Sequence, residues 1–234
     1  WIPERAVFNG FSGTNWIIIM TYLELINGVL RRLRENTVST YNETDYSTMI
    51  GDLVNDAKTT VEQSWEWSAL RNTITFNTVS ATTTYALTGA GQSSVLKECI
   101  NDTSNLFLQQ RTKTFFNSQN YTASPASGTP NYFTFNSTDT NGDIQVDVYP
   151  SPDGVYALRF DVVTPQAALE SDGTDISVPF NPVLQLAYGM ALRERGETGG
   201  QSAAEQFGVA QIALSDAIAL DANKYPLEMT FMAV

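Results

Sequence analysis

Residues 45–79, DYSTMIGDLVNDAKTTVEQSWEWSALRNTITFNTV, contain the change of pattern that decides the fold of this chain. From Asp45 to Leu70 the apolar residues recur every three or four positions, which predicts an amphipathic helix. At Thr73 this periodicity is lost, and threonine, a strand former, becomes frequent. The stretch therefore predicts a helix that leads directly into a β region.

The apolar face of this helix predicts what it packs against. Thr44 precedes the helix and is a suitable N-cap. The apolar stripe consists of Met49, Ile50, Leu53, Val54, Ala57, Val61 and Trp65. Trp67 lies off this stripe, so we expect it to anchor the β region rather than the helical core.

A second helical pattern precedes this one. Between Met20 and Arg34 apolar residues recur at intervals of three and four. The polar segment Thr37–Glu43 follows as a loop. These two helices are therefore expected to pair.

Two more helices are predicted near the C-terminus. Asn181-Pro182 matches an N-cap followed by proline in the first turn. Ser202 with Glu205 matches a capping box, which predicts a last helix that ends near Ala222. Gly199-Gly200 separates the two helices.

The middle of the chain is predicted to be rich in strands. Fifteen of the 27 threonines lie at 73–140, where charged residues are sparse. The predicted strands are Thr73–Val79, Thr83–Leu87, Val95–Asn101, Leu106–Gln109, Tyr132–Phe135, Asp143–Tyr149 and Val155–Val163. Turn signals such as Asn141-Gly142 and Asp153-Gly154 separate many of them, and Arg111–Asn117 is expected to form a helical turn or two.

The order of these elements predicts an α+β fold, an antiparallel helix bundle with an inserted β-rich domain, either a small barrel or a sandwich. Residues 20–72 and 182–224 would form the bundle and residues 73–165 the inserted domain, because two isolated helix pairs would bury their apolar faces poorly. Residues 1–19 lack a regular pattern, and we expect a leader, an extension or an artefact there. Residues 225–234 would form a C-terminal docking tail.

The composition of the 234-residue chain excludes several kinds of site. There is no histidine, so neither a Ser-His-Asp triad nor a histidine-ligated metal is available. The single cysteine, Cys99, cannot form an intrachain disulfide and is expected to be a buried small hydrophobe. A formal charge of −12 argues against binding to nucleic acid through its phosphates. No apolar run approaches the ~20 residues that a membrane-spanning helix needs.

Two short motifs imitate ligand-binding loops. Gly89-Ala90-Gly91 lacks the third glycine of a dinucleotide loop and is interpreted as a turn between strands. Asp139, Asn141 and Asp143 resemble the start of a calcium loop. Ile144 stands where that loop needs glycine, so a hairpin turn is the better interpretation.

Arg31, Arg32 and Arg34 form the only basic cluster of this acidic chain. As a solvated helix face they would pair with Glu35 or Glu24. The alternative is an intersubunit contact with an acidic face of a neighbouring copy.

The last ten residues are unusually apolar for the end of an acidic chain. The residues concerned are Tyr225, Leu227, Met229, Phe231, Met232 and Val234. This surface would be exposed unless the tail folds back or docks on a partner.

Carboxylates in the β region leave one enzymatic hypothesis open. Asp143, Asp147, Asp153 and Asp161 could include the carboxylate pair of a glycoside hydrolase. Strand alternation places Asp143 and Asp147 on one face, and a solvated strand face is the default interpretation.

Six stretches carry a resemblance to a known family. They are MTYLELIN (20–27), VNDAK (54–58), WEWSAL (65–70), GDIQVDVYP (142–150), RERGE (193–197) and LSDAIALD (214–221). From Met20 onward the chain resembles the head-to-tail adaptor, or tail tubular protein A, of short-tailed bacteriophages. Residues 1–19 have no counterpart in this resemblance.

The resemblance implies a structural virion protein without enzymatic activity or cofactor. About twelve copies would form a ring that joins the portal to the tail nozzle, after assembly in the host cytoplasm. Arg31, Arg32 and Arg34 would pack between subunits, and the apolar tail would engage the portal. DNA would pass through the acidic lumen without specific binding. The alternative is a carbohydrate-binding or polysaccharide-degrading tail component.

Overall fold

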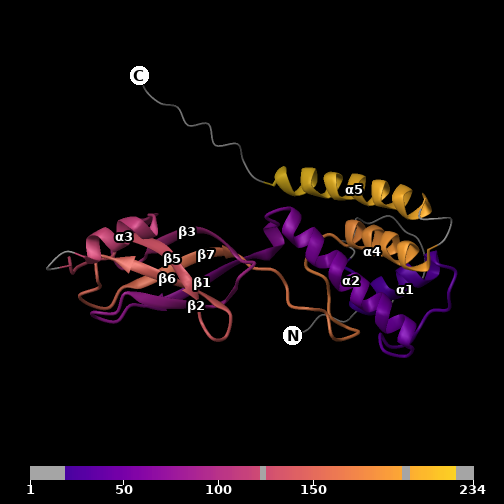
Figure 1. Ribbon diagram of the computed structural model, residues 1–234, viewed down its shortest axis with the longest axis horizontal. Helices are drawn as coiled ribbons and strands as arrows, with labels where there is room; N and C mark the ends of the chain where they lie inside the picture. Colours follow the sequence, from indigo (N-terminus) through magenta and orange to yellow (C-terminus); the bar gives the residue numbers. More distant parts are fainter. Residues whose placement is uncertain (1–18, 122–124, 197–200, 225–234) are drawn as a thin grey trace, which may run out of the picture.

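The structure, a computed structural model, describes residues 19–121, 125–196 and 201–224. Within these ranges it contains five α-helices and seven strands. The strands and one short helix lie at one end of an elongated molecule, and the other four helices lie at the opposite end (Figure 1). The predicted α+β class is confirmed.

The first two helices are both capped by a threonine, of which only Thr44 was predicted. Helix α1 (Tyr22–Arg32) starts after Thr21, whose hydroxyl accepts a hydrogen bond from the Glu24 backbone N–H while the Glu24 carboxylate accepts one from the Thr21 N–H. Helix α2 (Asp45–Ser64) starts after the predicted N-cap Thr44. It ends six residues before the predicted end, because the backbone is extended at Trp65, and a 3₁₀ turn follows at Ser68–Leu70.

Trp67, expected to anchor the β region, belongs instead to the helical core. Its side chain is 1% exposed and lies in the apolar cluster of the helices. The indole Nε1 donates a hydrogen bond to the Val61 carbonyl at 2.8 Å. The prediction was wrong because the chain leaves the helix before Trp67, so helical spacing does not describe its direction.

The last two helices start earlier than their predicted caps. Helix α4 (Phe180–Arg195) has Pro179 at its N-cap position, so Asn181 is already inside the helix. Helix α5 (Gln201–Ala222) already includes Gln201, so Ser202 is not its N-cap, although the helix ends at Ala222 as predicted.

Helix α4 lies between α5 and the pair formed by α1 and α2. It contacts all three helices, whereas α5 packs mainly on α4. Phe207, Leu214 and Ile218 of α5 are partly buried against the helical core. The inner face of α5 also carries small buried residues, which allow close approach to α4. They are Ala203, Ala210, Ala213 and Ala217. This arrangement does not confirm the predicted antiparallel bundle.

The seven predicted strands are confirmed, with ends that differ by up to four residues. They are β1 (Arg71–Asn77), β2 (Thr84–Gly91), β3 (Val95–Asn101), β4 (Leu106–Gln110), β5 (Tyr132–Thr138), β6 (Asp143–Tyr149) and β7 (Ala157–Val163). The sheet order is β1-β7-β3-β4-β5-β6-β2, and all pairs are antiparallel except β4 with β5. Strands β1 and β2 at the two ends also contact each other, so the sheet is nearly closed.

One predicted turn proves to be strand. Gly89-Ala90-Gly91 is the end of β2, where the register shifts between Ala86 and Gly91 and Ala90 is fully buried. Glycine indicates a bulge here rather than a turn.

The interior of the sheet is packed with apolar side chains, and one helix covers part of its outer face. Cys99 is fully buried in the interior, as predicted, and burial raises the pKa of its thiol. Helix α3 (Lys113–Asn120) confirms the predicted helical turns. It covers part of the outer face, where Phe115 and Phe116 pack edge-on against Tyr149.

A buried ion pair fixes the chain as it returns from β7. The Lys58 side chain is 2% exposed, and its Nζ lies 3.3 Å from both carboxylate oxygens of Glu62. The same Nζ donates to the carbonyls of Gln166 at 2.6 Å and Ala167 at 3.2 Å. The Gln166 N–H donates to Glu62. Burial raises the pKa of Glu62, while Lys58 opposes that rise.

We predict that Lys58→Met lowers the free energy of unfolding by about 3–5 kcal/mol, because it leaves a buried carboxylate unpaired. Lys97→Met is the matched control, since Lys97 pairs with Glu66 at the surface, where such pairs contribute about 1 kcal/mol or less. Urea unfolding of the two variants measures the difference. Equal losses would contradict the assignment of the Lys58 contact as a structural anchor.

Candidate interaction surfaces

The outer face of α5 is an apolar surface with little charge. Asp216 follows Glu205 by eleven positions, which is close to three helical turns, so both lie on one line along the helix. We define the α5 stripe as the exposed residues from Glu205 to Leu220 that lie along this line: Glu205, Gly208, Val209, Ile212, Asp216, Ala219 and Leu220. Val209, Ile212 and Leu220 are 48%, 65% and 70% exposed. Figure 1 shows α5 as the outermost helix of its part.

The α5 stripe departs from the usual design of a surface helix. The face toward α4 is also apolar, so α5 has apolar residues on both sides. A helix of this kind is normally buried on all sides. The sequence predicts this helix from its capping box and its end, and the signal for its exposed apolar face is the spacing of Val209, Ile212 and Leu220.

The end of α5 is fixed to the junction between the helices and the sheet by Asp221. The side chain of Asp221 is 5% exposed, and its carboxylate accepts hydrogen bonds from Trp65 Nε1 at 3.1 Å and from the Ser68 N–H at 3.0 Å and Oγ at 2.6 Å. Lys224 Nζ lies 2.8 Å away. Burial alone would raise the pKa of Asp221, but hydrogen bonds from Lys224, Ser68 and Trp65 outweigh it and lower the pKa to about 2.

The basic cluster lies at the C-terminal end of α1 and does not make the expected ion pairs. Glu35 pairs with Arg195, and Glu24 is used in the cap of α1. Arg32 donates to the Gly28 carbonyl at 3.1 Å. In the described part of the chain, the exposed side chains of Arg31 and Arg34 have no hydrogen bond or ion pair.

The predicted portal-binding residues, Tyr225, Leu227, Met229, Phe231, Met232 and Val234, lie outside the described residues.

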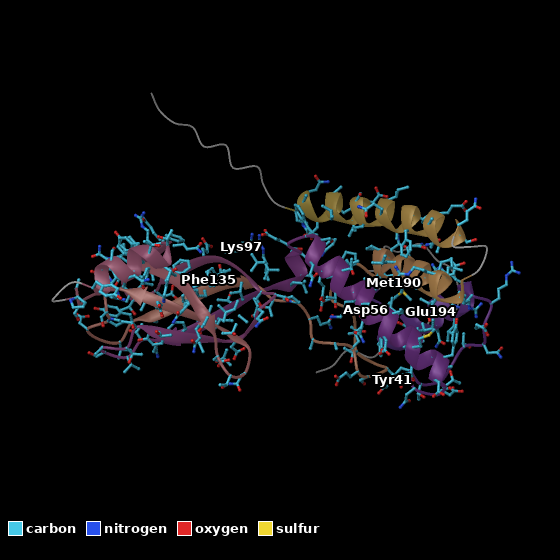
Figure 2. All side chains as sticks on the ribbon, in the orientation of Figure 1. Tyr41, Asp56, Lys97, Phe135, Met190 and Glu194 are labelled. Atoms are coloured by element: carbon cyan, nitrogen blue, oxygen red, sulfur yellow. The ribbon has the colours of Figure 1, made fainter. Side chains whose placement is uncertain are left out.

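A cleft of about 510 Å³ lies at the junction of the two parts. The end of α2 lines one side, and Val95 and Val163 line the other. Lys97, which pairs with Glu66 of this lining, lies between the two parts (Figure 2). The carboxylates of the cleft are therefore engaged in structural contacts.

The strand carboxylates also have structural partners. Asp147, expected on a solvated face, is 8% exposed because α3 covers it, and it binds Lys113, Thr84 and Asn136. Asp143 accepts from the Gly89 N–H at 3.0 Å. Asp153 accepts from the Tyr156 hydroxyl, and Asp161 from the Thr73 hydroxyl.

The calcium-like motif forms the predicted hairpin turn. Asp139 Oδ1 accepts hydrogen bonds from the backbone N–H groups of Asn141 and Asp143 at 2.8 and 2.9 Å. Among the described residues, no cluster of three acidic or cysteine side chains is arranged to hold a metal. No helix in the described ranges has the length and hydropathy that crossing a bilayer requires.

A family model for the SU10 adaptor protein matches residues 20–227. This chain belongs to the SU10 adaptor protein family. The resemblance to phage head-tail adaptors is thereby confirmed, and the adaptor is a structural component of a phage virion that interacts with other virion proteins. A search of curated proteins finds no match to the chain.

For this adaptor, we predict that Asp221→Asn destabilises the fold in a pH-dependent way. Because the pKa of Asp221 falls from 3.8 to about 2 on folding, its contribution is full above pH 5 and is lost as the pH falls toward 2. The difference in unfolding free energy between wild type and variant should therefore shrink by about 2 kcal/mol between pH 5 and pH 2.

Asp216→Asn is the control on the exposed side of the same helix. Within the described residues its carboxylate makes no hydrogen bond, so the substitution should change stability by less than about 0.5 kcal/mol at pH 7. Urea unfolding at several pH values checks both variants. A constant difference for Asp221→Asn would contradict the proposed anchor.

Proposed function

We propose that this adaptor forms a ring of about twelve copies that joins the portal to the tail nozzle and surrounds the path of the DNA. The observation that carries the proposal is the family match, which extends over both the helical part and the sheet. The elongated shape supports it, because the two ends of the molecule offer separate surfaces to two partners (Figure 1).

Different parts of the chain serve different contacts in this proposal. The exposed cations at the end of α1, Arg31, Arg32 and Arg34, take part in contacts between subunits. The apolar tail, residues 225–234, engages the portal, and loops of the β part meet the nozzle. Assembly takes place in the host cytoplasm, and the ring becomes part of the tail at the portal vertex.

The charge of the chain fits a conduit for DNA. At −12 per copy, a ring would carry a large negative charge, which repels the phosphate backbone and disfavours sticking. Charge reversal of lumen residues should slow DNA ejection if this repulsion is what keeps the genome mobile.

The role we propose is assembly without catalysis or a bound cofactor. Its support is that Asp143, Asp147, Asp153 and Asp161 all accept hydrogen bonds from neighbouring groups of the fold. These contacts give each of the four carboxylates a role in holding the fold together.

The decisive experiment is electron microscopy of the purified adaptor mixed with portal rings. We expect a second ring of density on the portal. Deletion of residues 225–234 should abolish this attachment, because it removes the apolar docking segment. Circular dichroism and thermal unfolding provide the control, since the deletion begins after the last helix and should leave the fold unchanged. A truncated chain that still binds portal rings would contradict the role of the tail.

A further inference from the structure

Two surfaces of the helical part lie on different helices and differ in chemistry. The α5 stripe is apolar and its two charges, Glu205 and Asp216, are acidic. The cluster at the end of α1 is basic. Helix α4 lies between them and contacts both helices. Within the described part of one copy, the acidic residues of the stripe have no basic partner and the basic cluster has no acidic partner. Each surface could supply the opposite charge to the other.

The α5 stripe is shaped for close contact. At Gly208 an added Cβ would meet nothing within 4 Å, so this position is open on the outside of the helix. Glu205 and Asp216 are about 16 Å apart along the helix axis. Val209 and Ile212 lie on either side of the line that joins them. The stripe is thus an apolar surface with a carboxylate toward each end.

The end of α1 offers the complementary charges. Arg31 and Arg34 are exposed and unpaired among the described residues, and each has an aliphatic stem that can cover apolar surface while its guanidinium reaches a carboxylate.

We infer that the α5 stripe binds the Arg31 and Arg34 end of α1 on a neighbouring copy. The inference rests on the proposed ring, and it names the surfaces that close it. Pairing of two α5 stripes would place Glu205 and Asp216 near like charges, which disfavours a two-fold dimer through this face. A contact between two different surfaces repeats from copy to copy and closes a ring when the rotation permits.

The apolar part of the contact is tested with Ile212→Glu and Gly208→Leu in the full chain. Ile212→Glu places a charge in the interface, and Gly208→Leu blocks close approach at a position where the folded chain has room. Each should raise the concentration for half-maximal assembly at least about tenfold, measured by sedimentation velocity and by occupancy of portal rings. Gln211→Glu, exposed on the same helix but outside the stripe, is the matched control and should assemble like wild type.

The charge contacts are tested by reversing the charges of each surface in turn. The variants Arg31→Glu/Arg34→Glu and Glu205→Arg/Asp216→Arg should each fail to assemble alone, because each brings like charges together. An equimolar mixture should recover rings, since every contact can then form between opposite charges.

The outcomes separate the two proposals. Wild-type protein that forms no ring alone or on portals overturns the proposed function. If the wild-type protein forms rings and the Ile212→Glu and Gly208→Leu variants form them equally well, the α5 assignment alone is overturned. A mixture of the charge variants that does not assemble overturns the pairing of these two surfaces. Thermal unfolding of each variant excludes loss of the fold as the cause.

Discussion

The chain crosses between the helices and the sheet at two places, and buried charged side chains fix both crossings. Lys58 and Glu62 hold the returning chain through the carbonyls and N–H of residues 166–167. Asp221 holds the departing chain at Trp65 and Ser68. A buried charge tolerates only a geometry that satisfies it, because its desolvation is costly. The two crossings are thereby restricted to one arrangement, and the sheet is attached to the helices at a defined place.

Helix α4 organises the rest of the helical part. It packs against α1, α2 and α5 and makes α5 an outer layer rather than one of four equivalent helices. Alanines on the inner face of α5 permit close packing, while the outer face keeps large aliphatic side chains in solvent. For a virion protein that interacts with other virion proteins, such a face is better explained by assembly than by the stability of the isolated chain.

The β part has a hydrophobic core of its own. Its interior holds Cys99, Phe133 and Phe160, and α3 covers a part of the outside where Asp147 pairs with Lys113. The sheet is nearly closed, which leaves few unpaired edges at which copies could associate wrongly.

The amino-acid sequence determined the elements and the class of fold. Local patterns were sufficient for the cap at Thr44, all seven strands, the end of α5 and the burial of Cys99, because caps, alternation and turn chemistry act over a few residues. The family was also apparent from its sequence stretches. Trp67 and Asn181 were misplaced because α2 ends before Trp65 and α4 begins two residues earlier than predicted, and either change alters the direction of a side chain.

Only the tertiary structure decided which groups meet. The contact of Asp221 with Ser68 joins residues 153 positions apart, and no local period encodes such a pairing. The ion pair of Glu35 with Arg195 is another long-range contact that no local period encodes. Because Glu35 pairs with Arg195, Arg31 and Arg34 are left exposed without partners among the described residues. Sequence periodicity specifies a face of a helix, whereas the packing of the whole chain decides whether that face is covered.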